Sequence, residues 1–153
     1  MDIQRLFLSA NGRIGRGEFW IGFLILFVLG IVVHFIPGLG QLLAILLIYP
    51  WVCLYSKRLH DMGKSGWLQL IPFAVWIVAV ILAVVMGGTA AIMAMAGSHA
   101  AAEAGALAGA GMAVLIMCAA ALIHLVFTLW VGLSPGQAGD NAYGLPPTAA
   151  AAA

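Results

Sequence analysis

Two adjacent residues, His60 and Asp61, have side chains that could do acid–base chemistry, because an imidazole beside a carboxylate can act as a general base. Successive residues of a helix diverge by about 100 degrees, however, so Asp61 is poorly placed to orient His60. Arg58 and Asp61 are three positions apart and share a helix face, which favours an ion pair. No Ser, Cys or metal ligand is spaced to complete a site. A structural polar latch is therefore favoured over catalysis in the segment 57–67.

A second polar segment, 11–20, places Arg13, Arg16 and Glu18 among glycines. One interpretation is a basic arm bound to anionic lipid, where each Lys or Arg adds about 1 kcal/mol near the surface. The other makes Arg13 and Arg16 a site for a phosphate or carboxylate. The lipid-bound arm is the favoured interpretation.

A third polar segment, 134–144, is rich in Gly, Pro and Asn, which predicts tight turns rather than a helix. Tyr143 could return to the membrane interface and let this segment fold under the helices. Cys53 and Cys118 lie inside apolar runs without metal-type spacing. We therefore expect no metal ion, no cofactor and no catalytic residue.

Four apolar stretches must position these segments. Hydrophobic residues make up 65% of the chain and charged residues 7%, against about a quarter in soluble domains. The sequence predicts an all-α polytopic membrane protein with one four-helix domain over 1–145, spans at about 19–36, 39–59, 66–86 and 112–133, and a disordered tail at 146–153. The second span needs Lys57 and Arg58 to extend toward the headgroups. The stretch 87–111 is a connector with helical tendency.

The charges predict the orientation of these spans. All six Lys and Arg residues lie in the N-terminal arm or in the loop between the second and third spans, none after Lys64. Positively charged loops face the cytoplasm, so both termini are predicted to be cytoplasmic. Trp20, Trp67 and Trp130 lie at predicted span ends, where Trp is favoured at the membrane interface.

The polar motifs resemble those of a known family. The segments GRIGRGEFW (12–20), KRLHDMGKSGW (57–67) and PGQAGDNAYG (135–144), in this order around four spans, are similar to the bacterial inner-membrane family called domain-of-unknown-function 805. Lys57 stands where the family often carries Arg, which keeps the charge. The resemblance implies an inner-membrane location and this architecture, and no assigned reaction.

We hypothesise that the motif positions converge into one polar cluster at the cytoplasmic ends of the helices, with Glu18 and Asp61 facing the arginines. Charges buried near a bilayer are tolerated only when they are well paired. The positions that the resemblance implies are Arg13, Arg16, Glu18, Arg58, His60, Asp61, Ser65, Asn141 and Tyr143.

The favoured function is a non-enzymatic integral inner-membrane protein whose motif cluster is structural, with binding of anionic lipid, a small anion or a partner protein left open. One alternative is an oligomeric small-solute transporter or channel, which requires a water-filled axis. Another is a membrane-embedded enzyme that acts on a lipid-linked substrate, which requires a cavity containing His60 and Asp61. The bilayer is the expected partner, a homo-oligomer or membrane-protein partner is left open, and no nucleic acid is expected.

The predicted topology can be tested by thiol labelling in a chain without Cys53 and Cys118. Cysteines introduced by Lys64→Cys and Glu103→Cys should be accessible from opposite sides of the membrane, because one span separates the two loops. Labelling of both from the same side would refute the four-span topology.

Overall fold

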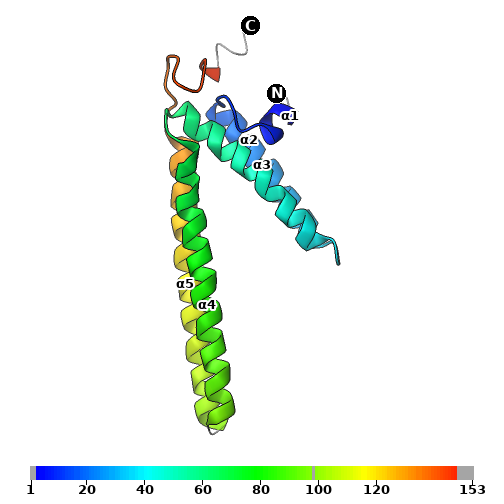
Figure 1. Cartoon of the computed structure of the whole chain (residues 1–153), viewed down its shortest axis with the longest axis vertical. Helices are drawn as coiled ribbons and strands as arrows, with labels where there is room; N and C mark the ends of the chain where they lie inside the picture. Colours follow the sequence, from blue (N-terminus) through cyan, green and yellow to red (C-terminus); the bar gives the residue numbers. More distant parts are fainter. Residues whose placement is uncertain (1–2, 98, 148–153) are drawn as a thin grey trace. The chain divides into compact units, whose positions relative to one another are not determined.

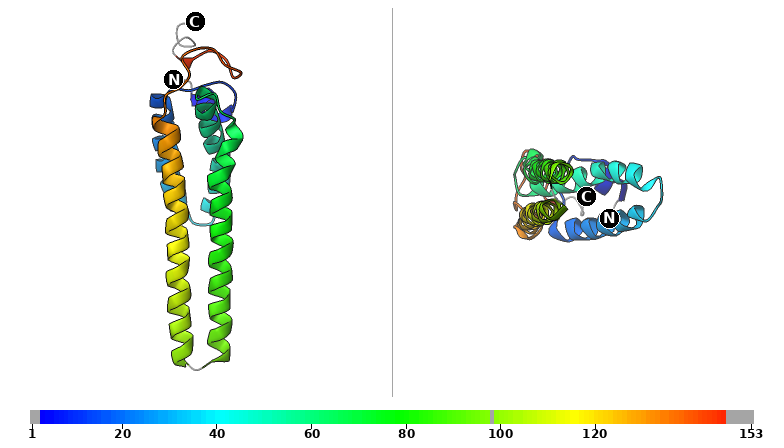
Figure 2. Two further views of the ribbon diagram at one scale, coloured as in Figure 1. Left: turned by 90° about the vertical axis from the view of Figure 1, so that its left-hand side faces the viewer. Right: turned by 90° about the horizontal axis from the view of Figure 1, so that it is seen from below.

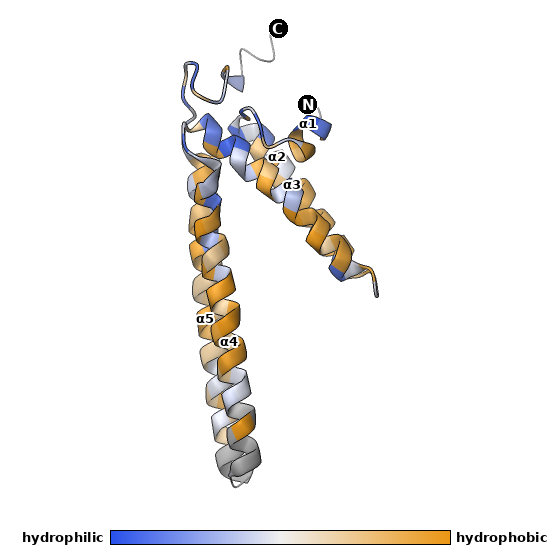
Figure 3. Ribbon diagram, in the orientation of Figure 1, coloured by the Kyte–Doolittle hydropathy of each residue, from blue (hydrophilic) through white to orange (hydrophobic). Residues whose placement is uncertain are grey.

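The computed structural model describes residues 3–97 and 99–147, and these residues form helices joined by turns (Figure 1). Four of the helices are long and apolar enough to cross a membrane, which confirms the predicted all-α polytopic fold. Apolar residues predominate along the middle of α3 and in the first half of α4 (Figure 3). The elements in chain order are α1 (Ile3–Leu8), α2 (Arg16–His34), α3 (Gly40–Asp61), the 3₁₀ helix η1 (Gly66–Gln69), α4 (Leu70–Ala96) and α5 (His99–Leu133).

The helix boundaries differ from the predicted spans mainly in the connector. α4 continues to Ala96 and α5 begins at His99, so most of the Ala/Gly-rich stretch 87–111 is helical. Alanine is the best helix former, so this stretch is helical although it is less apolar than the predicted spans. Residues 148–153 of the predicted disordered tail lie outside the described residues. The assignment of 1–145 to one domain stays a prediction.

Contacts divide the chain into two compact units, Met1–Gln69 with Leu129–Ala153, and Leu70–Thr128. In the first unit, α2 and α3 form an antiparallel hairpin whose turn contains Gly38 at φ +78°, a conformation that glycine adopts without strain. Aromatic rings join the two helices edge to face. The ring centroids of Phe19 and Tyr55 are 5.3 Å apart, and those of Phe23 and Trp51 are 5.1 Å apart.

The short helix α1 packs against α3 and buries Leu6 and Phe7. No pattern in the sequence predicts this helix, because six residues are too few to show a helical period. The N-terminal arm therefore returns to the helical hairpin rather than extending from it.

α3 ends in a Schellman motif. Lys64 N donates to Leu59 O at 2.9 Å and Gly63 N donates to His60 O at 2.9 Å, with Gly63 at φ +68°. Glycine is the usual residue at this position, because it adopts a positive φ without strain. The motif fixes the direction of the chain just after Asp61, which is the last residue of α3.

The second unit contains α4 and the part of α5 before Leu129, which run antiparallel to one another (Figure 2). Ala79 and Ala120 are buried, whereas most large side chains, such as Phe73, Leu82 and Leu125, are exposed and apolar. A continuous exposed apolar surface of this kind suits lipid acyl chains rather than water.

Candidate functional site: a charged cluster at the end of α3

The carboxylate of Asp61 lies between two guanidinium groups. Its Oδ1 accepts hydrogen bonds from Arg13 Nε at 3.1 Å and Arg13 Nη2 at 3.0 Å, and its Oδ2 accepts one from Arg58 Nη1. Asp61 is 4% exposed, Arg13 5% and Arg58 0%. These three residues, which we call the charged cluster, are therefore shielded from solvent and paired with one another.

Arg13 also binds the backbone of the C-terminal segment. Its Nη1 donates to Gly139 O at 2.7 Å and to Gly144 O at 3.1 Å, and its Nη2 donates to Gln137 O. All five N–H groups of this guanidinium therefore face an acceptor. Arg13 connects the loop before α2 both to the end of α3 and to the segment 134–145.

Arg58 binds the end of α5. Its Nε donates to Val131 O at 3.1 Å and its Nη2 donates to Ser134 O. The last carbonyl groups of a helix have no partner within it, and a cation there interacts favourably with the helix dipole, by about 0.3–1 kcal/mol or more when partly buried. Arg16 Nη1 lies 3.4 Å from Leu133 O, in the same last turn. Arg58 therefore pairs with a carboxylate and caps a helix at once.

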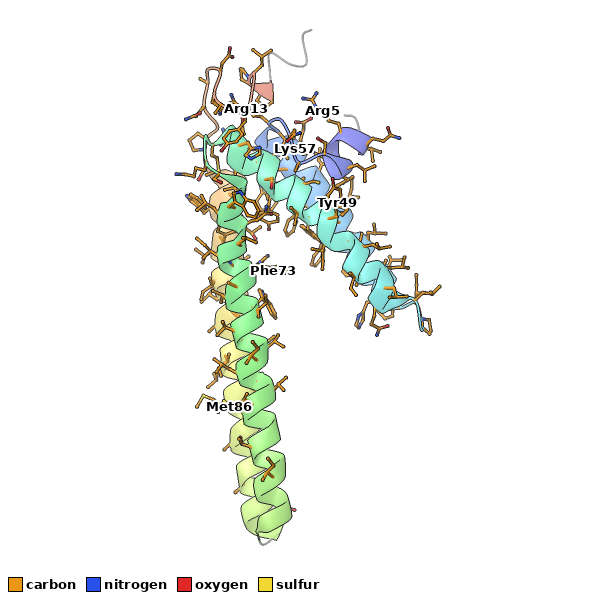
Figure 4. All side chains as sticks on the ribbon, viewed as in Figure 1. Arg5, Arg13, Tyr49, Lys57, Phe73 and Met86 are labelled. Atoms are coloured by element: carbon orange, nitrogen blue, oxygen red, sulfur yellow. The ribbon has the colours of Figure 1, made fainter. Side chains whose placement is uncertain are left out.

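Lys57 performs the same capping for α1. It is 1% exposed, and its Nζ donates to Leu6 O at 2.6 Å and to Arg5 O. Tyr49 Oη donates to Leu8 O at 3.0 Å. The expectation that Lys57 and Arg58 extend toward the headgroups is wrong, because carbonyl groups at helix ends offer both cations acceptors inside the protein. Figure 4 shows Lys57 and Arg13 at the same end of α3, with Tyr49 further along the helix.

A helical pattern in the sequence could have shown that Lys57 is buried. Cys53, Leu54, Lys57, Arg58 and Asp61 follow the spacing of one helix face, in a part of α3 where every residue from 53 to 59 is buried. The apolar stripe of this helix thus continues directly into three charged residues. A charged residue on such a stripe predicts a buried partner, and for Lys57 the partners are carbonyl groups of α1.

His60 and Asn141 hold the C-terminal segment over the end of α3. The ring of His60 stacks on that of Tyr143, with centroids 3.8 Å apart and planes 3° apart. Asn141 Nδ2 donates to His60 O at 2.9 Å, and Asn141 Oδ1 accepts from Tyr143 N at 2.8 Å. His60 Nδ1 lies 3.3 Å from Gly12 O. These motif residues therefore make a clasp beside the charged cluster.

Glu18 and Ser65 cap helix starts, and within the described residues they are hydrogen-bonded to neither the charged cluster nor the clasp. Glu18 Oε2 accepts a hydrogen bond from Gly15 N at 3.3 Å, so it caps the start of α2, and among the described residues it forms no ion pair with an arginine. Ser65 Oγ accepts from Trp67 N at 3.3 Å and caps η1. The hypothesis that Glu18 faces the arginines is wrong, because a carboxylate at the third position of a helix reaches its first free N–H group.

Backbone groups of the segment 134–145, which motifs of side chains do not reveal, complete the site. Gln137 N donates to Asp61 O at 2.8 Å. A Cβ atom on Gly136 would lie 2.7 Å from the carboxylate carbon of Asp61. Glycine at position 136 therefore lets the backbone approach the carboxylate closely.

The charged cluster has a net charge of +1, from two guanidinium groups and one carboxylate. Carbonyl groups from the C-terminal end of α5 and the segment 134–145 surround it and offset this charge. Among the described residues, no group of His, Cys, Asp and Glu side chains could hold a metal ion. The arrangement can join chain segments; it leaves the Arg13 guanidinium no N–H group for a further ligand.

Comparison with known proteins gives a family and three uncharacterised relatives. Residues 7–94 match the family described as "Protein of unknown function (DUF805)". In Escherichia coli strain K12, the "Uncharacterized protein YiiR" is 32% identical over 83 residues, 50% of this chain and 57% of YiiR. The inner membrane proteins YhaH and YhaI are each 28% identical over 53% of this chain and cover 79% and 78% of their own lengths.

The region matched by the family contains only part of the site. The chain spans little more than half the length of YiiR. The family match includes Arg13, Arg58 and Asp61 but ends before the segment 134–145. No solved structure matches the chain significantly.

The close approach at Gly136 can be tested by adding one methyl group. Gly136→Ala should lower the free energy of unfolding by about 1–3 kcal/mol, because the new Cβ overlaps the Asp61 carboxylate. The measurement is thermal unfolding in detergent. Gly139→Ala is the matched control, since nothing lies within 4 Å of its Cβ position. Equal stability of both variants would contradict the described contact.

The capping of α1 by Lys57 predicts a local effect. Lys57→Met should speed amide hydrogen exchange in residues 3–8 by about tenfold or more, because each hydrogen bond to the ammonium contributes about 1.5–3 kcal/mol. Hydrogen exchange with mass spectrometry measures this, and Lys64→Met, at an exposed lysine, serves as control. Unchanged protection of α1 in Lys57→Met would show that the ammonium does not hold the helix.

Proposed function

The chain belongs to the DUF805 family, in which YhaH and YhaI are named inner membrane proteins, and we propose that its charged cluster is a structural latch at the cytoplasmic face. The latch joins the loop before α2, the end of α3, the end of α5 and the segment 134–145. In this proposal the protein is a non-enzymatic membrane component that presents a rigid cytoplasmic end.

One observation carries the proposal: both oxygens of a single buried carboxylate accept hydrogen bonds from arginines on separate segments. Removing one partner from such an arrangement leaves an uncompensated buried charge, which costs about 3–5 kcal/mol. Each segment therefore depends on the presence of the others, as expected for a latch.

Burial argues for a latch, against catalysis by Asp61 and against anion binding by the arginines of the charged cluster. A catalytic carboxylate needs contact with substrate, whereas Asp61 is 4% exposed and its oxygens are occupied. One face of the His60 ring is covered by Tyr143. A groove of about 430 Å³ in the first unit lies elsewhere and contains neither residue; its lining is Leu26, Phe27, Gly30, Ile31, His34, Phe35 and Trp51.

The charge distribution supports the cytoplasmic placement. In the first unit, Arg5, Arg13 and Lys57 lie near the same end of the α2–α3 hairpin (Figure 4). All six Lys and Arg residues precede position 65 and lie in the arm or around the loop after α3. Positive charge retains such an end on the cytoplasmic side during insertion.

Replacing the shared carboxylate tests the latch. Asp61→Asn should lower the free energy of unfolding by about 3–5 kcal/mol, because two buried arginines lose their counter-ion while side-chain volume is conserved. The readout is thermal unfolding in detergent. Asp140→Asn, at an exposed carboxylate in the C-terminal segment, should change stability by no more than about 0.5 kcal/mol.

The same comparison can contradict the proposal. If Asp61→Asn unfolds at the temperature of the parent chain, the latch is wrong. Loss of binding of an anionic lipid or a small anion in the same variant would then make the charged cluster a dedicated binding site.

A further inference from the structure

We propose that Arg16, Lys64 and Trp130 form a docking surface for the phosphate of an anionic phospholipid, separate from the charged cluster. We call these three residues the lipid-facing set. The inference rests on the proposed placement of this end of the hairpin at the cytoplasmic leaflet, and it assigns a ligand class to cations that the latch does not use.

The six cations of the chain fall into two groups by exposure. Arg13, Lys57 and Arg58 are at most 5% exposed, and their N–H groups donate to carbonyl or carboxylate oxygens. Arg16 and Lys64 are exposed, as is Arg5 on α1. A lipid phosphate can reach only the second group. The motif at 12–20 therefore contains one buried arginine of the latch, Arg13, and one exposed arginine, Arg16.

Arg16 and Lys64 converge on one turn of α5. Arg16 Nη1 lies 3.4 Å from Leu133 O, and Lys64 Nζ lies 5.7 Å from the centre of the Trp130 ring. Trp130 and Leu133 both belong to the last turn of α5. Two exposed cations from distant parts of the sequence therefore lie along the same last turn.

The donors of these cations remain available. Within residues 3–97 and 99–147, Arg16 makes a single long hydrogen bond and the Lys64 ammonium contacts only a ring face. Glu18, the nearby carboxylate in sequence, is engaged at the start of α2. An arginine edge with free N–H groups suits a phosphate, which accepts two parallel hydrogen bonds.

The neighbouring aromatic residues favour a lipid phosphate over one in solution. Trp130 is 40% exposed and Trp67, three residues after Lys64, is 77% exposed. Indole rings prefer the level of the headgroups, where an apolar body meets acyl chains and the N–H group meets water. The lipid-facing set thus combines positive charge with groups that seek the membrane interface.

The test titrates short-chain phosphatidylglycerol into the purified chain in neutral detergent and follows the unfolding temperature. We expect a saturable rise with phosphatidylglycerol and a smaller one with phosphatidylcholine. The double variant Arg16→Gln/Lys64→Gln should bind phosphatidylglycerol about thirtyfold more weakly, from about fivefold per cation. Its unfolding temperature without added lipid should fall by no more than about 4 °C, because the variant loses one long hydrogen bond and one exposed cation–π contact.

A charge-conserving double variant, Arg16→Lys/Lys64→Arg, should retain most of the affinity for phosphatidylglycerol. That result would show that positive charge at these two positions is responsible for the binding. Equal responses to both lipids, or full affinity in the Gln double variant, would overturn the proposal. A full response to inorganic phosphate would show a site for a free anion instead. Failure of the latch is seen separately, as unchanged stability of Asp61→Asn, and leaves the lipid preference in place.

Discussion

A carboxylate shared by two buried guanidinium groups constrains the rest of this structure. An ion removed from water costs several kcal/mol, and the cost is offset only when every partner is in place. Asp61 meets this condition through Arg13 and Arg58, which come from the loop before α2 and from its own helix. The loop, the helix end and the C-terminal segment must therefore be ordered together. The short tight segments around the charged cluster follow from this requirement, including Gly136, where a side chain would displace the carboxylate.

Backbone carbonyl groups at helix ends supply acceptors for the buried cations, which among the described residues outnumber the buried carboxylates. The whole chain has six Lys and Arg residues, yet among the described residues only Asp61 forms ion pairs with them. The other acceptors are backbone carbonyl groups: those at the C-terminal ends of α1 and α5 bind Lys57 and Arg58, and those of the segment 134–145 bind Arg13. The carbonyl groups at helix ends lack partners within their helices and carry partial negative charge. Capping thus satisfies the cation and the helix together, without adding a second carboxylate near the bilayer.

Features that repeat along the chain could be predicted, and features set by backbone contacts could not. Hydropathy gave four spanning helices, and a three-residue spacing indicated the pair of Arg58 with Asp61. The contact of Arg13 with Asp61 joins residues 48 positions apart, and no local spacing encodes it; only the family resemblance placed them together. Carbonyl acceptors at Gln137, Gly139 and Gly144 have no signature because every residue has a carbonyl group. The assignment of Glu18 failed for a related reason, since an N–H group in its own helix turn was a nearer partner than any arginine.

The contacts of the first unit also constrain how often the chain crosses the membrane. Arg13 precedes α2 and bonds to Asp61 at the end of α3, so the chain between them must return to the side from which it left. Asp61 O accepts a hydrogen bond from Gln137 N, so the chain from η1 through α5 must also return to the side from which it left. Each interval holds two helices long enough to span a bilayer, so each crosses an even number of times. These hydrogen bonds do not depend on which face is positive, and they give the four-helix topology a support independent of the charge rule. The charge rule is then needed only to decide which side of the membrane this end faces. The proposed cytoplasmic placement of the polar motifs rests on that decision.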